Sequence, residues 1–152
     1  MGKGKIKNKK NMKVSNKKIV VLTLILFTVS FAFSQNEKHP IDIKNIQCHE
    51  NSIPTTHAAM QCEDEALKAW QTEMNFYLEK LKEKSELINV ALLLDAQEKW
   101  HAFHKADVAL YASYLQQLYQ GGTLGRVAII TYEKKLIRKR TLHLQGFYED
   151  LE

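Results

Sequence analysis

The chain has 152 residues and a formal charge of +5, but residues 1–34 hold eight of the 22 lysines and arginines and none of the 17 acidic residues. Residues 35–152 therefore carry a formal charge of −3, so the basic total gives no support to nucleic-acid binding. Two prolines and six glycines exclude collagen-like and Pro/Gly-rich disordered chains and argue against a turn-rich β-sandwich, and the length after residue 34 suits one domain.

Residues 1–34 have the three parts of a secretory signal peptide. A lysine-rich stretch precedes the apolar run of residues 19–33, and small residues, Ala32 and Ser34, stand before a cleavage point at Gln35. The alternative is an uncleaved membrane anchor, but an apolar run of about 15 residues is shorter than the roughly 20 that a spanning helix needs. We expect cleavage and export, to a periplasm or to the cell exterior, with membrane contact only through the signal peptide.

Residues 35–54 contain both prolines and no sustained periodicity, so we expect an extended arm. The two cysteines of the chain are Cys48, in this arm, and Cys62, just beyond it. Because exported proteins fold in an oxidising compartment, we expect these thiols to form a structural disulfide. The alternatives are a metal site that includes His49 and His57, and a redox pair, although a redox pair normally has the C-x-x-C spacing that is absent here.

Residues 55–152 are expected to form a helical domain with three helices. The first runs over roughly residues 56–83, because Pro54 followed by Thr55 and Thr56 is a start signal. Its apolar residues recur at steps of three and four: Ala59, Cys62, Ala66, Trp70, Met74, Tyr77 and Leu81. A disulfide at Cys62 would tie the arm to the start of this helix.

The second helix is expected from Leu87 to about residue 120, and the pattern Asp95-x-x-Glu98 matches a capping box, which allows a kink or restart there. Gly121-Gly122 ends this helix, and Thr123 can cap the third. No segment shows the alternation of a strand. Short connections favour antiparallel neighbours, so we predict an all-α antiparallel three-helix bundle with an extended N-terminal arm tied by one disulfide.

A series of short motifs follows the predicted helices. They are Cys48, Thr55-Thr56, Met60, Cys62, Tyr77-x-x-x-Leu81, Ala96-Gln97-x-x-Trp100-x-x-Phe103, Gly121-Gly122-Thr123, Arg140 and Leu144. Over about residues 48–144 this order resembles the LprI-like lysozyme inhibitor family of small exported bacterial proteins. The resemblance implies a helical binding module that inhibits lysozyme by covering or plugging its sugar-binding cleft, without chemistry of its own.

Two features depart from the family pattern. Family members commonly carry a second cysteine pair, one just after the tryptophan block and one in the last helix. In this chain the position of the first of these cysteines falls within residues 104–108, and Tyr132 stands near the position of the second, so this pair is absent. His104 also replaces the arginine that usually follows the aromatic residue of the block. A helical core survives such changes more readily than a binding surface does, so the resemblance supports the fold more firmly than the inhibition.

Gln97, Trp100 and Phe103 lie within two helical turns and have two interpretations. In the first, Gln97 hydrogen-bonds in a helix interface while both rings fill the core. In the second, the rings form an exposed binding patch. His101 and His104 could share a metal ion, but no third ligand is evident, so we expect no metal site.

The third predicted helix carries a basic cluster. Its members are Lys134, Lys135, Arg138, Lys139 and Arg140. The cluster is either a solvated helix face or a surface that holds anionic envelope polymer or lipid.

The sequence contains no G-x-S-x-G, H-E-x-x-H, P-loop or dinucleotide-binding motif, so we expect neither enzymatic activity nor a cofactor. Two functions remain. The resemblance implies an exported binding module for lysozyme or another protein, and the charge of residues 35–152 is compatible with a basic partner. The alternative is a structural or envelope-associated protein that binds anionic polymer or lipid through the basic cluster.

Overall fold

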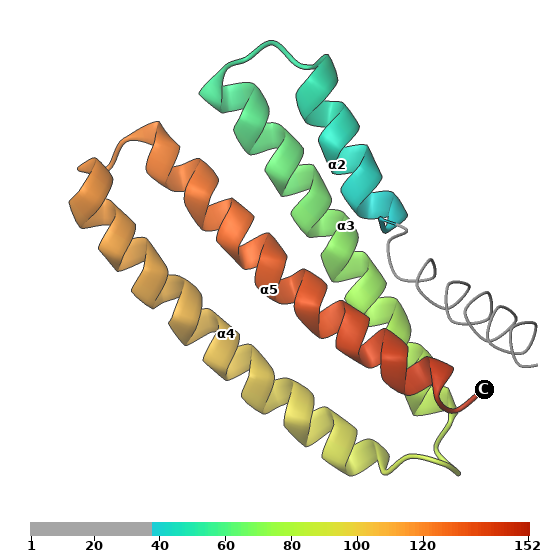
Figure 1. Cartoon of the computed structure of the whole chain (residues 1–152). Helices are drawn as coiled ribbons and strands as arrows, with labels where there is room; N and C mark the ends of the chain where they lie inside the picture. Colours follow the sequence, from blue (N-terminus) through green and yellow to red (C-terminus); the bar gives the residue numbers. More distant parts are fainter. Residues whose placement is uncertain (1–37) are drawn as a thin grey trace, which may run out of the picture. The chain divides into compact units, whose positions relative to one another are not determined.

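A computed structural model describes residues 38–152 of the chain, and the predicted signal peptide lies outside them. Four helices make up the described part: α2 (Pro40–Asn51), α3 (Thr56–Glu83), α4 (Val90–Tyr119) and α5 (Thr123–Glu149) (Figure 1). The described residues contain no strand, which confirms the predicted all-α class. Within the same range, no helix combines the length and the apolar character that crossing a membrane would require.

The prediction of an extended arm is wrong, because residues 40–51 form helix α2. Pro40 stands at the first helical position, where a missing N–H group costs nothing. The His39 ring accepts a hydrogen bond from the Ile41 N–H group at 3.3 Å and caps the helix. The two prolines do not indicate an extended chain here, because Pro40 starts the helix and Pro54 follows its end.

Helix α3 has the predicted bounds, and its cap is Thr55, whose hydroxyl accepts a hydrogen bond from the Ala58 N–H group at 3.1 Å. Helix α4 begins later than predicted, because the Asn89 side chain caps it through the Leu92 N–H group at 3.1 Å. It does not restart at Asp95, which instead pairs with Lys99 one turn on.

Helix α5 differs from the prediction at its first residue. Thr123 is its first helical residue rather than its cap, and the cap is Gly122, which has no side chain to bond with.

The four helices lie in the order α2, α3, α5, α4 (Figure 1). The main contact joins α3 to α5, while α2 packs against α3 and α4 packs against α5. The core between them is formed by Leu67, Trp70, Met74, Leu81, Leu93, Ile137 and Leu144. The arrangement is therefore a row of four helices rather than the predicted three-helix bundle, and α4 is an edge helix.

Because α4 lies at the edge, it exposes many large apolar side chains. These are Leu92, Leu94, Phe103, Leu110, Tyr114, Leu118 and Tyr119. At about 100° per residue, Leu92, Phe103, Leu110 and Tyr114 share one side of the helix. Only Leu93, His104 and Leu115 of α4 are buried. An edge helix with an apolar outer side is typical of a protein that binds a partner.

Candidate functional site

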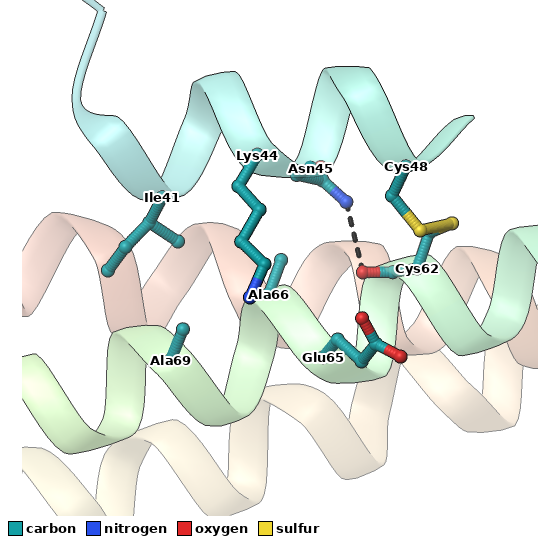
Figure 2. Close-up of a pocket in the computed structure, with 8 residues that line it drawn as sticks. All are labelled: Ile41, Lys44, Asn45, Cys48, Cys62, Glu65, Ala66 and Ala69. Atoms are coloured by element: carbon teal, nitrogen blue, oxygen red, sulfur yellow. Dashed lines mark hydrogen bonds between the residues drawn. A yellow bond between two sulfur atoms is a disulfide. The ribbon is translucent and has the colours of Figure 1, made fainter. Parts of the chain in front are cut away.

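Cys48 of α2 and Cys62 of α3 form a disulfide, with their Cα atoms 5.7 Å apart. This confirms the predicted pairing, and with both sulfur atoms in the bond neither cysteine is a free thiolate that could bind a metal ion. A pocket lies beside the bond, between α2 and α3 (Figure 2). Its lining includes Ile41 and Lys44 from α2 and Ala66 and Ala69 from α3. The Asn45 side-chain amide donates to the Cys62 carbonyl oxygen at 3.0 Å and fixes the two helices at this point.

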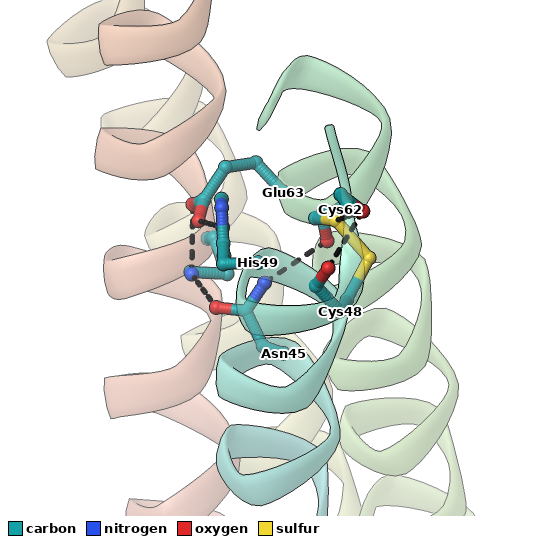
Figure 3. A network of polar contacts seen from close by, with 7 residues as sticks. Asn45, Cys48, His49, Cys62 and Glu63 are labelled. Atoms are coloured by element: carbon teal, nitrogen blue, oxygen red, sulfur yellow. Dashed lines mark hydrogen bonds and ion pairs between the residues drawn. A yellow bond between two sulfur atoms is a disulfide. The ribbon is translucent and has the colours of Figure 1, made fainter. Parts of the chain in front are cut away.

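A buried carboxylate, Glu63, follows the disulfide and joins three helices (Figure 3). Its Oε2 atom lies 2.7 Å from Lys134 Nζ of α5, and its Oε1 atom lies 2.8 Å from His49 Nε2 of α2. Lys134 also donates to Asn45 Oδ1 at 2.6 Å. Burial by itself raises the pKa of Glu63, but hydrogen bonds from Lys134, His49 and Thr131 together with the Lys134 charge hold that pKa below its ordinary value.

The basic cluster of α5 does not form one solvated face. Lys134 is engaged by Glu63, and Arg138 pairs with Asp42 of α2 at 2.8 Å. Arg140 points toward α4, while Lys135 and Lys139 are exposed. Three of the five cations therefore take part in contacts between helices.

Gln97 connects α3, α4 and α5. Its Oε1 atom accepts a hydrogen bond from Arg140 Nε at 2.9 Å, and its Nε2 atom lies 3.7 Å from the sulfur of Met74. Trp100 is half-buried against the core, and the Arg140 guanidinium lies 5.7 Å from its ring centroid. These positions agree with the interpretation of Gln97 and Trp100 as interface residues. Burial lowers the pKa of Arg140.

Phe103 has a different place from the two other residues of its motif. Its side chain is 62% exposed, so it does not fill the core as the first interpretation required. The reason is geometric: at about 100° per residue, Phe103 lies about 100° around the helix from His104, which is buried toward α5, and on the side of exposed Leu110. Phe103 belongs to the exposed apolar side of α4.

His104 is a buried residue whose role the sequence did not reveal. Its ring stacks on Trp100 with centroids 5.0 Å apart, and its Nε2 atom has no hydrogen-bond partner and lies 4.0 Å from Glu133. Burial lowers the pKa of His104, the charge of His101 adds to this, and the carboxylates of Glu133 and Asp107 oppose it. No group of three or more His, Cys, Asp or Glu side chains in residues 38–152 is placed to hold a metal ion.

Gly121 and Gly122 form the turn between α4 and α5. Gln120 and Gly121 both have left-handed backbone conformations, with φ of 48° and 79°, and the Gly122 N–H group donates to the Tyr119 carbonyl oxygen at 2.8 Å. Two left-handed residues in sequence reverse the chain within a short distance. The two glycines thus belong to the turn, as predicted, and lie away from Gln97 and Trp100.

Several residues of these contacts carried no recognisable signal in the sequence. Asp42 and His49 lie in the segment that was predicted to be extended, so no helix face could be assigned to them. Glu63 is the first of three consecutive acidic residues, followed by Asp64 and Glu65, so its neighbours in the sequence do not mark it as buried. Its burial follows from its place on α3, on the side that meets Lys134.

One of three comparisons with known proteins gives a match. The family model described as Lysozyme inhibitor LprI matches residues 48–144, which is more than half of the chain. The search of curated proteins and the search of solved structures returned no match.

Proposed function

Since the chain belongs to the LprI family of lysozyme inhibitors, we propose that it binds a lysozyme and inhibits it. The match over residues 48–144 carries this proposal, because it spans the disulfide, all of α3 and α4 and most of α5. Inhibition requires a rigid scaffold and a surface that occupies the enzyme's cleft. It does not require a catalytic group in the inhibitor.

The scaffold that we propose for this role is the contact between α3 and α5. Thr141 of α5 is fully buried, and its hydroxyl lies 3.2 Å from the Trp70 carbonyl oxygen of α3. The disulfide joins α2 to α3, and the ion pair of Arg138 with Asp42 joins α2 to α5, so α2 belongs to the same unit. Such a core limits the entropy that binding costs, because the binding surface is ordered beforehand.

The binding surface in this proposal is the exposed part of α4 and the turn that follows it. Aromatic and large aliphatic side chains dominate the energetics of protein interfaces. Phe103, Leu110 and Tyr114 are more than half exposed, which is unusual for such residues on a small domain.

Export is part of the same proposal. A disulfide that closes between two helices forms readily in an oxidising compartment, and lysozyme acts on cell walls outside the cytoplasm. We therefore keep the prediction that residues 1–34 are removed and that the protein reaches a periplasm or the cell exterior. Mass spectrometry of exported material should give Gln35 as the first residue, and retention of residues 19–33 would contradict it.

The deciding experiment is a titration of the purified, oxidised protein against the lytic activity of a panel of lysozymes on suspended peptidoglycan. We expect saturable loss of activity against at least one of them, with one inhibitor bound per enzyme. A protein of similar size and charge without inhibitory activity serves as the control. Full lysozyme activity at a large molar excess of the folded protein would refute the proposal.

The alternative, an envelope protein that holds anionic polymer through the basic cluster, has less support, because Lys134, Arg138 and Arg140 are engaged within the fold. Only Lys135 and Lys139 remain as exposed members of that cluster. Binding to anionic polymer that weakens as salt increases, and that is lost when both lysines become glutamate, would favour this alternative.

A further inference from the structure

The chain reverses between α4 and α5 in a narrow tip formed by residues 118–126, which we call the hairpin tip. Gly125 is buried there, and a Cβ atom on it would lie 3.5 Å from the Tyr119 side chain. A Cβ atom on Gly122 would lie 3.1 Å from the Tyr119 carbonyl oxygen. The two helices thus approach each other closely at this end, because glycine stands where they meet.

The backbone of the hairpin tip holds a residue in an uncommon conformation. Gln120 is the one non-glycine residue with positive φ in the part of the chain that the structure describes. A side chain in this conformation costs about 1 kcal/mol. Such conformations gather at sites that bind ligands or partners.

The hairpin tip also differs from the rest of the domain in its charge. Between Asp107 and Glu133 the chain contains a single charged residue, Arg126, and this residue is exposed. Leu118 and Leu124 are more than half exposed beside it, and Tyr119 is 41% exposed. In a domain with a net negative charge, the hairpin tip itself carries one cation among apolar side chains and no carboxylate.

The active site of a glycosidase carries acidic groups, whereas the hairpin tip carries a cation. Glycosidases of this kind use two carboxylates that flank the scissile bond, in a cleft shaped to hold a sugar chain. A guanidinium group binds carboxylates through two parallel hydrogen bonds. A narrow apolar tip with one arginine and no acidic side chain is complementary to such a cleft in both shape and charge.

Given the proposed function, on which this step rests, we propose that the hairpin tip enters the lysozyme cleft and that Arg126 pairs there with the catalytic carboxylates. Leu118, Tyr119 and Leu124 then contact the cleft surfaces that otherwise hold the sugar rings. The exposed lysines Lys135 and Lys139 are less suited to this role, because they lie within α5 rather than at its end.

The test compares Arg126→Ala and Arg126→Glu with the matched control Lys139→Glu, an exposed cation on the same helix. The inhibition constant is measured against a lysozyme that the unaltered protein inhibits. We expect Arg126→Ala to raise it by at least about 30-fold and Arg126→Glu by more, as for the loss of a buried charge pair, while Lys139→Glu changes it less than about threefold. Circular dichroism checks that each variant is folded.

A second measurement examines where the inhibitor binds. A chitin oligosaccharide that fills the cleft should compete with the inhibitor, and Leu124→Ser should weaken inhibition without altering the fold. Inhibition that is indifferent to the oligosaccharide would overturn the proposal.

The outcomes separate this inference from the proposed function. If the unaltered protein inhibits and both Arg126 variants inhibit equally well, the hairpin tip is not the inhibitory element, although the proposed function stands. If the unaltered protein inhibits no lysozyme, the proposed function and the inference about the hairpin tip are both refuted. If the Arg126 variants change the oligomeric state measured by light scattering, the tip is a contact between copies of this chain and the inference is wrong.

Discussion

The hydroxyl of Tyr132 on α5 donates a hydrogen bond to Asp107 Oδ2 on α4 at 2.6 Å. These two residues lie in or near the segments for which the family resemblance implied a second cysteine pair. The Tyr132 ring also stacks on Tyr111 of α4, with centroids 4.2 Å apart. In this chain a hydrogen bond and an aromatic stack therefore join α4 to α5 at this point.

Removing this hydrogen bond should loosen α4. Tyr132→Phe keeps the ring but leaves Asp107 without this donor, so we expect a lower free energy of unfolding. Urea unfolding measures the loss. Tyr114→Phe, at an exposed tyrosine of α4, is the control and should change stability by less than about 0.5 kcal/mol. Equal effects of the two substitutions would contradict this account.

The disulfide should matter most for α2. This helix has 12 residues, none of them fully buried, and a helix of that length is marginal by itself. Replacing Cys48 and Cys62 by serine should lower stability by about 3 kcal/mol at most and leave most of the helicity. Hydrogen exchange should quicken in α2 more than in α3. An unchanged melting temperature would show that the bond is dispensable, and two reactive thiols in unreduced exported protein would show that it does not form.

The pair of Glu63 and Lys134 should be costly to break. Their side chains are only 7% and 12% exposed, so a variant that removes one charge leaves the other in a poorly solvated place. We expect Glu63→Gln to lower the free energy of unfolding by about 3 kcal/mol. Glu65→Gln, at an exposed carboxylate of the same helix, should have little effect. A loss below about 1 kcal/mol for Glu63→Gln would show that water solvates the charge of Lys134 in the variant.

The lowered pKa of His104 predicts a loss of stability in mild acid. The unfolded chain binds a proton near the ordinary pKa of 6.5, whereas the folded chain binds it only at lower pH, so the unfolded state holds more protons between the two values. The contribution of neutral His104 to the free energy of unfolding is therefore complete above the pKa of the unfolded state. It is lost as pH falls from that value toward the pKa of the folded state.

This pH effect can be separated from that of Glu63. Urea unfolding from pH 7.5 to 5 should show a decline for the unaltered protein and a smaller one for His104→Gln. The carboxylate of Glu63 has a pKa lowered from 4.5, so its contribution persists above that value and is lost as pH falls below it. A decline above pH 5 that is the same in both proteins would assign the effect to another group.

Local patterns in the sequence were enough to predict several elements. The apolar stripe of α3 and the start signal at Pro54 and Thr55 predicted its bounds, because a continuous face of large side chains has one way to be buried. The turn at Gly121 and Gly122 was predicted for an equally local reason, since glycine adopts the left-handed backbone without strain. The disulfide followed from the presence of two cysteines in a chain predicted to be exported, and the family from motifs in order.

Contacts between distant residues decided the rest. Helix α2 has no buried stripe to predict it, and it is held by Cys62, by Arg138 and by Lys134, which come later in the chain. The outward position of Phe103 also depended on packing, because α4 carries apolar residues on several sides and the sequence does not say which side meets α5. The sequence around a cationic residue of a helix does not show whether its side chain will face water or a carboxylate. Lys134 and Arg138 face inward because Glu63 of α3 and Asp42 of α2 lie within a few ångströms of them. These carboxylates are far away in the sequence, so only the tertiary structure shows the pairing.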